Sequence, residues 1–109
     1  MPPRTTFRLP GGLTITEPQH AVLCLLAAWP QAWAHEEQVA VALRLPERAA
    51  RTVLVSLAGK GLVVEDRTWI GEWRVTAEGC GAAWQVEQQR RRRAVVGGGK
   101  GTRQVGRAA

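Results

Sequence analysis

The sequence predicts one small α+β domain, in which three helices are followed by a β-hairpin and a last helix. The chain has 109 residues, 45% of them hydrophobic, which suffices for a single domain with a modest core. Apolar residues recur at helical spacing in the helical segments, whereas residues 62–75 contain two β-prone runs around a loop. We therefore divide the chain into an N-terminal arm or hairpin (1–16), the domain proper (17–93) and a disordered basic tail (94–109).

The first elements follow from turn and capping signals. Short alternating runs on both sides of Pro10-Gly11-Gly12 predict a small hairpin or an extended arm. Thr16 and Gln19 have the spacing of a capping box, so a helix is expected to begin there and to end before Pro30. The buried stripe expected for this helix consists of Val22, Leu25, Leu26 and Trp29. Residues 31–34 are expected to form a short connection that pairs as an edge strand.

Two further helices are predicted between residues 36 and 59. The first opens with Glu36 and Glu37, which suit the positive end of the helix dipole, and ends near Arg44. The second extends from Pro46, a residue favoured in the first turn, to Gly59, where a glycine-rich segment stops it. The expected buried residues are Val39, Ala42 and Leu43 in the first helix and Ala50, Val53, Leu54 and Leu57 in the second.

The hairpin and the last helix complete the predicted domain. Residues 62–65 and 72–75 are predicted as strands joined by a loop. Thr76 is expected to cap the last helix, and Gly79 and Gly81 are each expected to weaken it by about 1 kcal/mol relative to alanine. The packing face predicted for this helix comprises Cys80, Ala83, Trp84 and the aliphatic part of Glu87.

The order of these elements is typical of a winged helix, with a three-helix helix-turn-helix core, a hairpin wing and a C-terminal helix. Residues 17–88 resemble regulators of the MarR/PadR type. The resemblance rests on the spacing of two groups of residues: Val39-Ala40, Leu43-Arg44-Leu45-Pro46, Ala50, Leu54, Leu57 and Gly61-Leu62-Val63; and Trp73-Arg74-Val75-Thr76-Ala77-Glu78-Gly79. It implies that residues 46–59 form a recognition helix that enters the major groove of DNA.

The sequence departs from the pattern of these regulators at three places. Arg44 stands where they usually have glycine, so the turn is expected to avoid the left-handed conformation there. The wing carries Trp69 and Ile70 where basic residues are commoner. Long flanking helices for dimerisation are missing, so a homodimer would have to form through the last helix or the N-terminal hairpin.

The basic charge of the chain is concentrated at its C-terminal end. The formal net charge is +6, but residues 90–109 hold seven of the 15 Lys and Arg residues and none of the nine acidic ones. Residues 1–89 are therefore close to neutral. Four consecutive arginines begin the basic segment, which suits an electrostatic arm for phosphate groups.

We predict sequence-specific binding of double-stranded DNA, in the service of transcriptional regulation. Arginine on the outward face of a recognition helix can donate two hydrogen bonds to guanine, while basic residues elsewhere hold the phosphate backbone. The candidate DNA-contacting residues are Glu47, Arg48, Arg51, Thr52, Val55 and Ser56 in the recognition helix, Arg67 and Arg74 at the wing, and Arg90, Arg91, Arg92 and Arg93 in the basic segment.

Each candidate also has a purely structural interpretation. Arg48 and Arg51 could be solvated side chains of an amphipathic helix, and the wing arginines could pair with Glu65, Asp66 or Glu72. The basic tail could serve solubility, or meet RNA or anionic lipid. The alternative function is a protein-interaction module that binds a partner through the surface around Trp69, with a tail that binds nucleic acid non-specifically.

Other function classes find little support. The longest apolar run is far shorter than the ~20 residues that span a bilayer, and no export signal is recognised at the N-terminus, so we expect a cytoplasmic protein without membrane contact. Cys24 and Cys80 are expected to be reduced thiols. No catalytic set or metal-ligand spacing is visible, and we expect neither enzymatic activity nor a metal or other cofactor.

Overall fold

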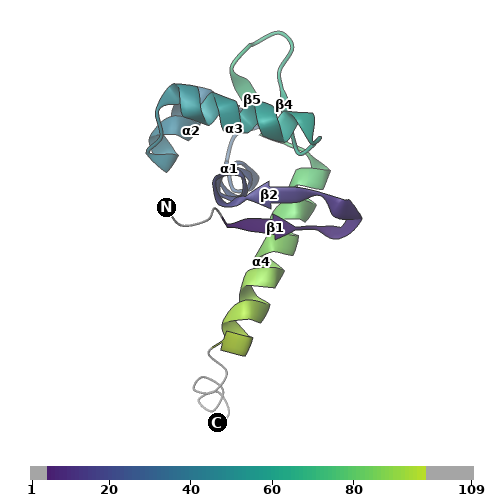
Figure 1. The fold of residues 1–109 in the computed structure, drawn as a ribbon. Helices are drawn as coiled ribbons and strands as arrows, with labels where there is room; N and C mark the ends of the chain where they lie inside the picture. Colours follow the sequence, from purple (N-terminus) through teal and green to yellow (C-terminus); the bar gives the residue numbers. More distant parts are fainter. Residues whose placement is uncertain (1–4, 98–109) are drawn as a thin grey trace.

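The computed structural model describes residues 5–97 and confirms the α+β winged-helix fold (Figure 1). A short N-terminal hairpin precedes three helices, a second hairpin and a long C-terminal helix. In chain order the elements are β1 (Thr6–Arg8), the 3-10 helix η1 (Pro10–Gly12), β2 (Thr14–Thr16), α1 (Glu17–Ala27), β3 (Ala34–His35), α2 (Glu36–Leu43), α3 (Glu47–Gly59), β4 (Val63–Glu65), β5 (Glu72–Val75) and α4 (Ala77–Gly97).

Two antiparallel sheets flank the helices. The hairpin β1–β2 forms a sheet of its own, with Phe7 opposite Ile15. The second sheet has the order β3-β5-β4, so that the wing strand β5 lies in the middle and pairs with β3 through Ala34 and Trp73. The edge strand expected near residues 31–34 therefore exists, at the end of that segment.

The core draws on nearly every element. The largest fully buried side chains are Trp73, Phe7, Ile15, Leu23, Leu54, Leu57, Val22, Val39 and Val86. The first hairpin supplies Phe7, Leu9 and Ile15, so it is an integral layer of the domain and not a loose arm. On α3, the predicted stripe is confirmed, with Ala50, Leu54 and Leu57 fully buried.

The first helix begins as predicted and ends earlier. Thr16 and Gln19 form the complete capping box, with Thr16 Oγ1 accepting from the Gln19 N–H at 3.3 Å. The expected end at Trp29 was wrong, because α1 ends at Ala27. The Trp29 N–H bonds the Leu26 carbonyl three residues back, at 3.2 Å. This tighter turn satisfies the last carbonyls before Pro30.

The turn between α2 and α3 corrects two predictions. Arg44 adopts the left-handed conformation after all, with φ 57° and ψ 45°, because a residue of that conformation is needed to end α2 and let α3 start at Glu47. Ala42, expected to be buried, is exposed. Ala40 takes its place in the core beside Val39.

The rotation of α4 is set by Gly79. This glycine is buried against Val75 and the backbone of Leu62, so the inward face of α4 continues through Ala82, Ala83 and Val86. The predicted packing roles of Cys80 and Trp84 were therefore wrong, since both face outward and Trp84 is 60% exposed.

The prediction for the start of α4 is confirmed, whereas the prediction for its end was wrong. Thr76 caps the helix as predicted, its Oγ1 accepting from the Gly79 N–H at 3.0 Å. Residues 94–97, assigned to the disordered tail, belong instead to α4, since arginine is a good helix former and lets the helix continue. The remainder of the predicted tail, 98–109, lies outside the described residues. Within residues 5–97 no helix is both long and apolar enough to cross a membrane.

A small polar cluster lies where the first hairpin, α1 and α4 meet. His20 is buried, and its Nε2 lies 3.2 Å from Cys24 Sγ. Burial and the nearby Arg90 guanidinium lower the pKa of His20 below 6.5, outweighing the opposite effect of Glu87 and Glu17. Burial likewise raises the pKa of Cys24, which is an unpaired thiol.

Candidate nucleic-acid interface

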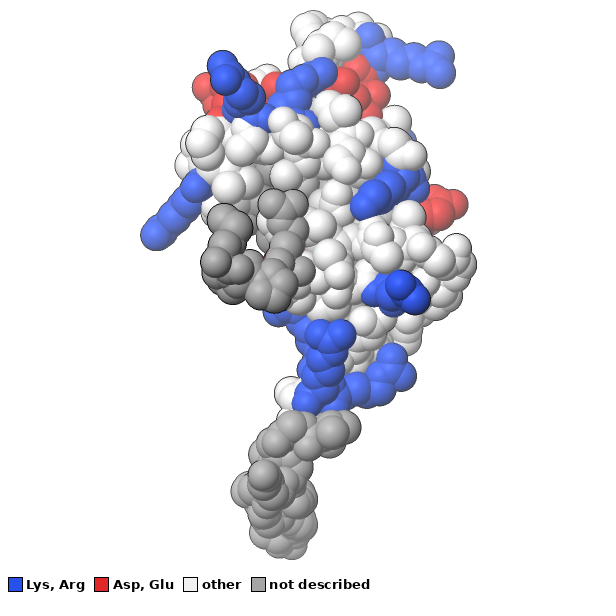
Figure 2. Space-filling view, in the orientation of Figure 1, with Lys and Arg blue, Asp and Glu red and all other residues white. Residues whose placement is uncertain are grey.

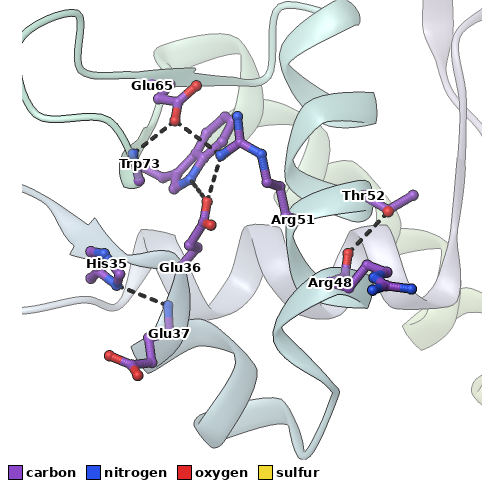
Figure 3. A network of polar contacts seen from close by, with 9 residues as sticks. His35, Glu36, Glu37, Arg48, Arg51, Thr52, Glu65 and Trp73 are labelled. Atoms are coloured by element: carbon purple, nitrogen blue, oxygen red, sulfur yellow. Dashed lines mark hydrogen bonds and ion pairs between the residues drawn. The ribbon is translucent and has the colours of Figure 1, made fainter.

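The outward face of α3 presents a short polar surface in its first three turns. Glu47, Arg48 and Thr52 are exposed, and Val55 is 49% exposed. Thr52 Oγ1 donates to the Arg48 carbonyl at 3.0 Å, which leaves the oxygen lone pairs and the methyl group available. In Figure 3, Arg48 and Thr52 lie on the side of α3 away from the ion-pair network described below.

A groove adjoins this surface where α3 meets the start of α1. Its volume is about 920 Å³, and Arg48, Thr52 and Ser56 form part of its wall. Ser56 Oγ accepts from Gln19 Nε2 at 2.9 Å, which ties the second half of α3 to α1. Ser56 thus lies toward α1, at the margin of the exposed face.

Arg51 occupies a different environment from Arg48. Its Nη1 donates to Glu36 Oε1 at 2.7 Å and to Glu65 Oε2 at 3.1 Å, as Figure 3 shows. Trp73 Nε1 donates to the same Glu36 oxygen at 3.0 Å, and the Gly71 N–H donates to the same Glu65 oxygen at 2.8 Å. Arg51 therefore joins α3 to the start of α2 and to the wing.

The charges of this network reinforce one another. Hydrogen bonds to Glu65 and Glu36 raise the pKa of Arg51 above its usual value. Burial alone would raise the pKa of Glu65, but the hydrogen bonds from Gly71 and Arg51 outweigh it and hold that pKa below 4.5. Both groups are thus ionised over the neutral range, and their ion pair connects the wing to α3.

The two wing arginines have unequal surroundings. Arg74 stacks on the ring of Trp33, with its guanidinium carbon 4.8 Å from the ring centroid. Arg67 lies exposed in the loop between β4 and β5. Within residues 5–97 neither forms an ion pair with Glu65, Asp66 or Glu72.

The four consecutive arginines of α4, residues 90–93, also differ in their surroundings. Arg90 pairs with Glu17 and lies over the ring of Phe7, 5.5 Å from its centroid, while Arg93 lies 5.7 Å from the same centroid. Arg91 and Arg92 are exposed on α4. Figure 2 shows acidic residues near the wing and helices α2 and α3, while the lower end of α4 displays only basic ones.

Sequence reasoning missed two contributors to this surface. Arg44 is exposed in the turn directly before α3, and its only signal was the unusual residue type at that turn. Glu36 was interpreted only as a helix-dipole residue. Its contact with Arg51, 15 residues away, had no local signal.

Comparison with known proteins identifies the fold. No family model matches the sequence, and no curated protein matches it. Among solved structures, the PcaV transcriptional regulator of Streptomyces coelicolor, crystallised with its natural ligand, superposes with a TM-score of 0.64 and 23% identity over 86% of this chain. A point mutant of MepR from S. aureus superposes with a TM-score of 0.58 and 21% identity over 75% of this chain. NMB1585, a MarR family regulator from Neisseria meningitidis, superposes with a TM-score of 0.55 and 19% identity over 80% of this chain.

This chain spans 68%, 64% and 63%, respectively, of the lengths of those three chains. The protein therefore has the winged helix-turn-helix fold seen in these structures.

Proposed function

We propose that this protein binds double-stranded DNA sequence-specifically and regulates transcription. The observation that carries the proposal is the exposed face of α3, where Arg48, Thr52 and Val55 point outward from the second helix of a helix-turn-helix. The fold is shared with PcaV, a transcriptional regulator, and with NMB1585, a regulator of the MarR family.

In this proposal Arg48 is the main reader of base edges. It stands in the first turn of α3 and has a guanidinium that can donate two hydrogen bonds to O6 and N7 of guanine. Val55 and the Thr52 methyl group offer apolar contact to a thymine methyl, and Ser56 can donate to a phosphate. Glu47 can accept from cytosine N4, although at the N-terminus of α3 it also stabilises the helix dipole.

Arg51 is assigned a supporting part in this proposal. Because its Nη1 is held by Glu36 and Glu65, the side chain orients the wing relative to α3, and any contact with DNA would come from its remaining donors. Arg74, stacked on Trp33, is assigned the same kind of part. Arg67 at the wing, and Arg91 and Arg92 on α4, are the side chains we assign to phosphates.

Selection of bound sequences from a random DNA pool, followed by fluorescence anisotropy with the full chain, tests base reading. Arg48→Ala is expected to weaken binding to the selected sequence by about 5- to 150-fold, the equivalent of 1–3 kcal/mol for a bidentate base contact, with less effect on random DNA. Arg8→Ala, which removes another exposed arginine, from β1, is the matched control and should change affinity less than about twofold. Equal losses on both DNAs would contradict base reading by Arg48.

The salt dependence of binding tests the backbone contacts. Arg91→Ala together with Arg92→Ala is expected to reduce the slope of log K against log salt by about 1.8, because each lost phosphate contact contributes about 0.9. The preferred sequence should not change. An unchanged slope would mean that Arg91 and Arg92 of α4 do not contact phosphates.

The exposed wing tip favours a second candidate, a protein-interaction module. Trp69 is 69% exposed and Ile70 68%, on a body that is nearly neutral. Failure of the pool to yield any preferred sequence, with Trp69→Ala abolishing association with a protein partner, would favour this candidate.

The expectation of a homodimer stays a prediction. Within the described residues, we propose the exposed Trp84 of α4 as the contact. Light scattering on the full chain, with Trp84→Ala for comparison, measures the mass directly. A monomeric mass at every concentration would contradict the predicted homodimer.

A further inference from the structure

A cleft lies between the wing loop (residues 66–71) and the segment around β3. It has a volume of about 390 Å³ and is lined by Trp33, His35, Asp66, Trp69, Ile70 and Glu72. That volume lies within the range of small-molecule sites. Neither the DNA-reading face of α3 nor the arginines of α4 contribute a wall, so the cleft is a separate feature of the surface.

The chemistry of the lining is that of a site for a positively charged organic group. Two indole rings supply electron-rich faces, and two carboxylates supply negative charge, while no lysine or arginine lines the cleft. We propose that this cleft binds a small organic cation with a quaternary ammonium group. Such a cation can satisfy ring faces and carboxylates together without needing a hydrogen-bond donor.

One indole of the cleft already holds a cation. The Arg74 guanidinium carbon lies 4.8 Å from the Trp33 ring centroid, within the range of cation–π attraction. The second indole, Trp69, is 69% exposed, and no cation–π partner is found for it among residues 5–97. Trp69 is therefore the ring face that the ligand would cover.

The carboxylates differ in how firmly they are held. Asp66 Oδ1 accepts the N–H groups of Thr68 at 2.7 Å and Trp69 at 3.0 Å, which fixes both the carboxylate and the backbone of the tryptophan. Within the described chain Glu72 has no ion-pair partner. The acidic side of the cleft thus combines one anchored charge and one that a ligand could neutralise.

His35 lines the cleft from the start of α2. Its Nδ1 accepts the Glu37 N–H at 3.1 Å, and its ring packs against Gly71, where an added Cβ would lie 3.0 Å from Nε2. The imidazole therefore acts as a wall at the foot of the wing loop. Two cationic side chains adjoin the lining residues: Arg74 stacks on Trp33, and Arg67 is in the same loop as Trp69.

Choline and its neutral isostere 3,3-dimethylbutanol provide the test, because they differ mainly in charge. Each is titrated into the full-length protein without DNA, and the five tryptophan indole N–H signals are followed by ¹H–¹⁵N NMR, with assignments from single Trp→Phe variants. Choline is expected to shift the signals of Trp33 and Trp69, with millimolar affinity, and to bind at least fivefold more tightly than the isostere. Equal affinity of the two compounds, or no shift at either signal, would overturn the proposal.

Variants separate this cleft from general hydrophobic binding. Trp69→Ala and Glu72→Gln should each weaken choline binding at least fivefold, whereas Glu78→Gln, which removes an exposed carboxylate from the start of α4, should leave it unchanged. Loss of binding in the Glu78 variant, or unchanged binding in the other two, would contradict the assignment. If Trp69→Ala failed to fold by circular dichroism, Glu72→Gln would decide alone. Since no DNA is present, the result is independent of the proposed role of α3.

Discussion

Replacing Gly79 by alanine is expected to destabilise the fold by about 2 kcal/mol. An added Cβ would overlap the Leu62 carbonyl oxygen and come within 2.6 Å of Val75 Cγ2. The Leu62 carbonyl also accepts the Thr76 N–H at 3.0 Å, so it cannot move away without breaking the link between wing and helix. Overpacking costs about 1–3 kcal/mol and more against backbone, and the better helix propensity of alanine returns only about 1 kcal/mol.

Urea unfolding, followed by far-ultraviolet circular dichroism, measures this loss. Gly81→Ala is the matched control, since it lies two residues further along the same helix and a Cβ there meets nothing within 4 Å. The control should gain about 1 kcal/mol, which would raise the melting temperature by about 4–8 °C in a domain of this size. The two variants should therefore differ by about 3 kcal/mol. Equal stability of both would refute the close approach of α4 to Leu62.

Three other perturbations have outcomes fixed by the structure. Arg44→Gly should stabilise the protein by about 1 kcal/mol in urea unfolding, because it relieves the left-handed strain of a residue with φ 57°; destabilisation would mean that Arg44 makes a contact of its own. The pKa of His20 is lowered on folding, so the unfolded chain binds the proton more tightly, and the unfolding free energy should fall as pH drops below 6.5. His20→Gln should remove this pH dependence of the unfolding free energy. An unchanged pH dependence would mean that another group causes it. The pKa of Glu65 is also lowered on folding, so its contribution to the unfolding free energy is present above about pH 4.5 and is lost below. Arg51→Met should reduce this contribution and speed hydrogen exchange at the Gly71 N–H. Unchanged exchange would show that Arg51 does not hold the wing.

The helices could be predicted because their signals are local. The capping box of Thr16 and Gln19 lies within four residues, and the stripe of Ala50, Leu54 and Leu57 repeats within two turns. Such patterns predict these helices and the buried face of α3 from neighbouring residues alone. Gly79 is the opposite case, since its role depends on the backbone of Leu62, 17 residues earlier. Without that contact the rotation of α4 was misjudged, and with it the exposure of Trp84.

The candidate interface could likewise be predicted only where its signals are local. Periodicity alone placed Arg48, Thr52 and Arg51 outside the core, which the structure also shows. Arg48 and Arg51 are separated by about 60° around the helix, because three residues advance it by about 300°. That difference turns Arg51 toward the point where Glu65 arrives with the wing, and no pattern within α3 could have revealed it.

The interlocking of the first strand with the last helix has a consequence for the order of folding. Phe7 is fully buried, Gln89 Nε2 donates to the Arg8 carbonyl at 2.8 Å, and the two partners lie 81 residues apart. During synthesis, β1 emerges before α4, so the part of Phe7 that α4 covers stays exposed until α4 has been made. Contacts of such long sequence separation slow folding, because the intervening chain must first be ordered. The nascent domain would thus expose part of this phenylalanine until α4 is complete, a period in which chaperones could recognise it.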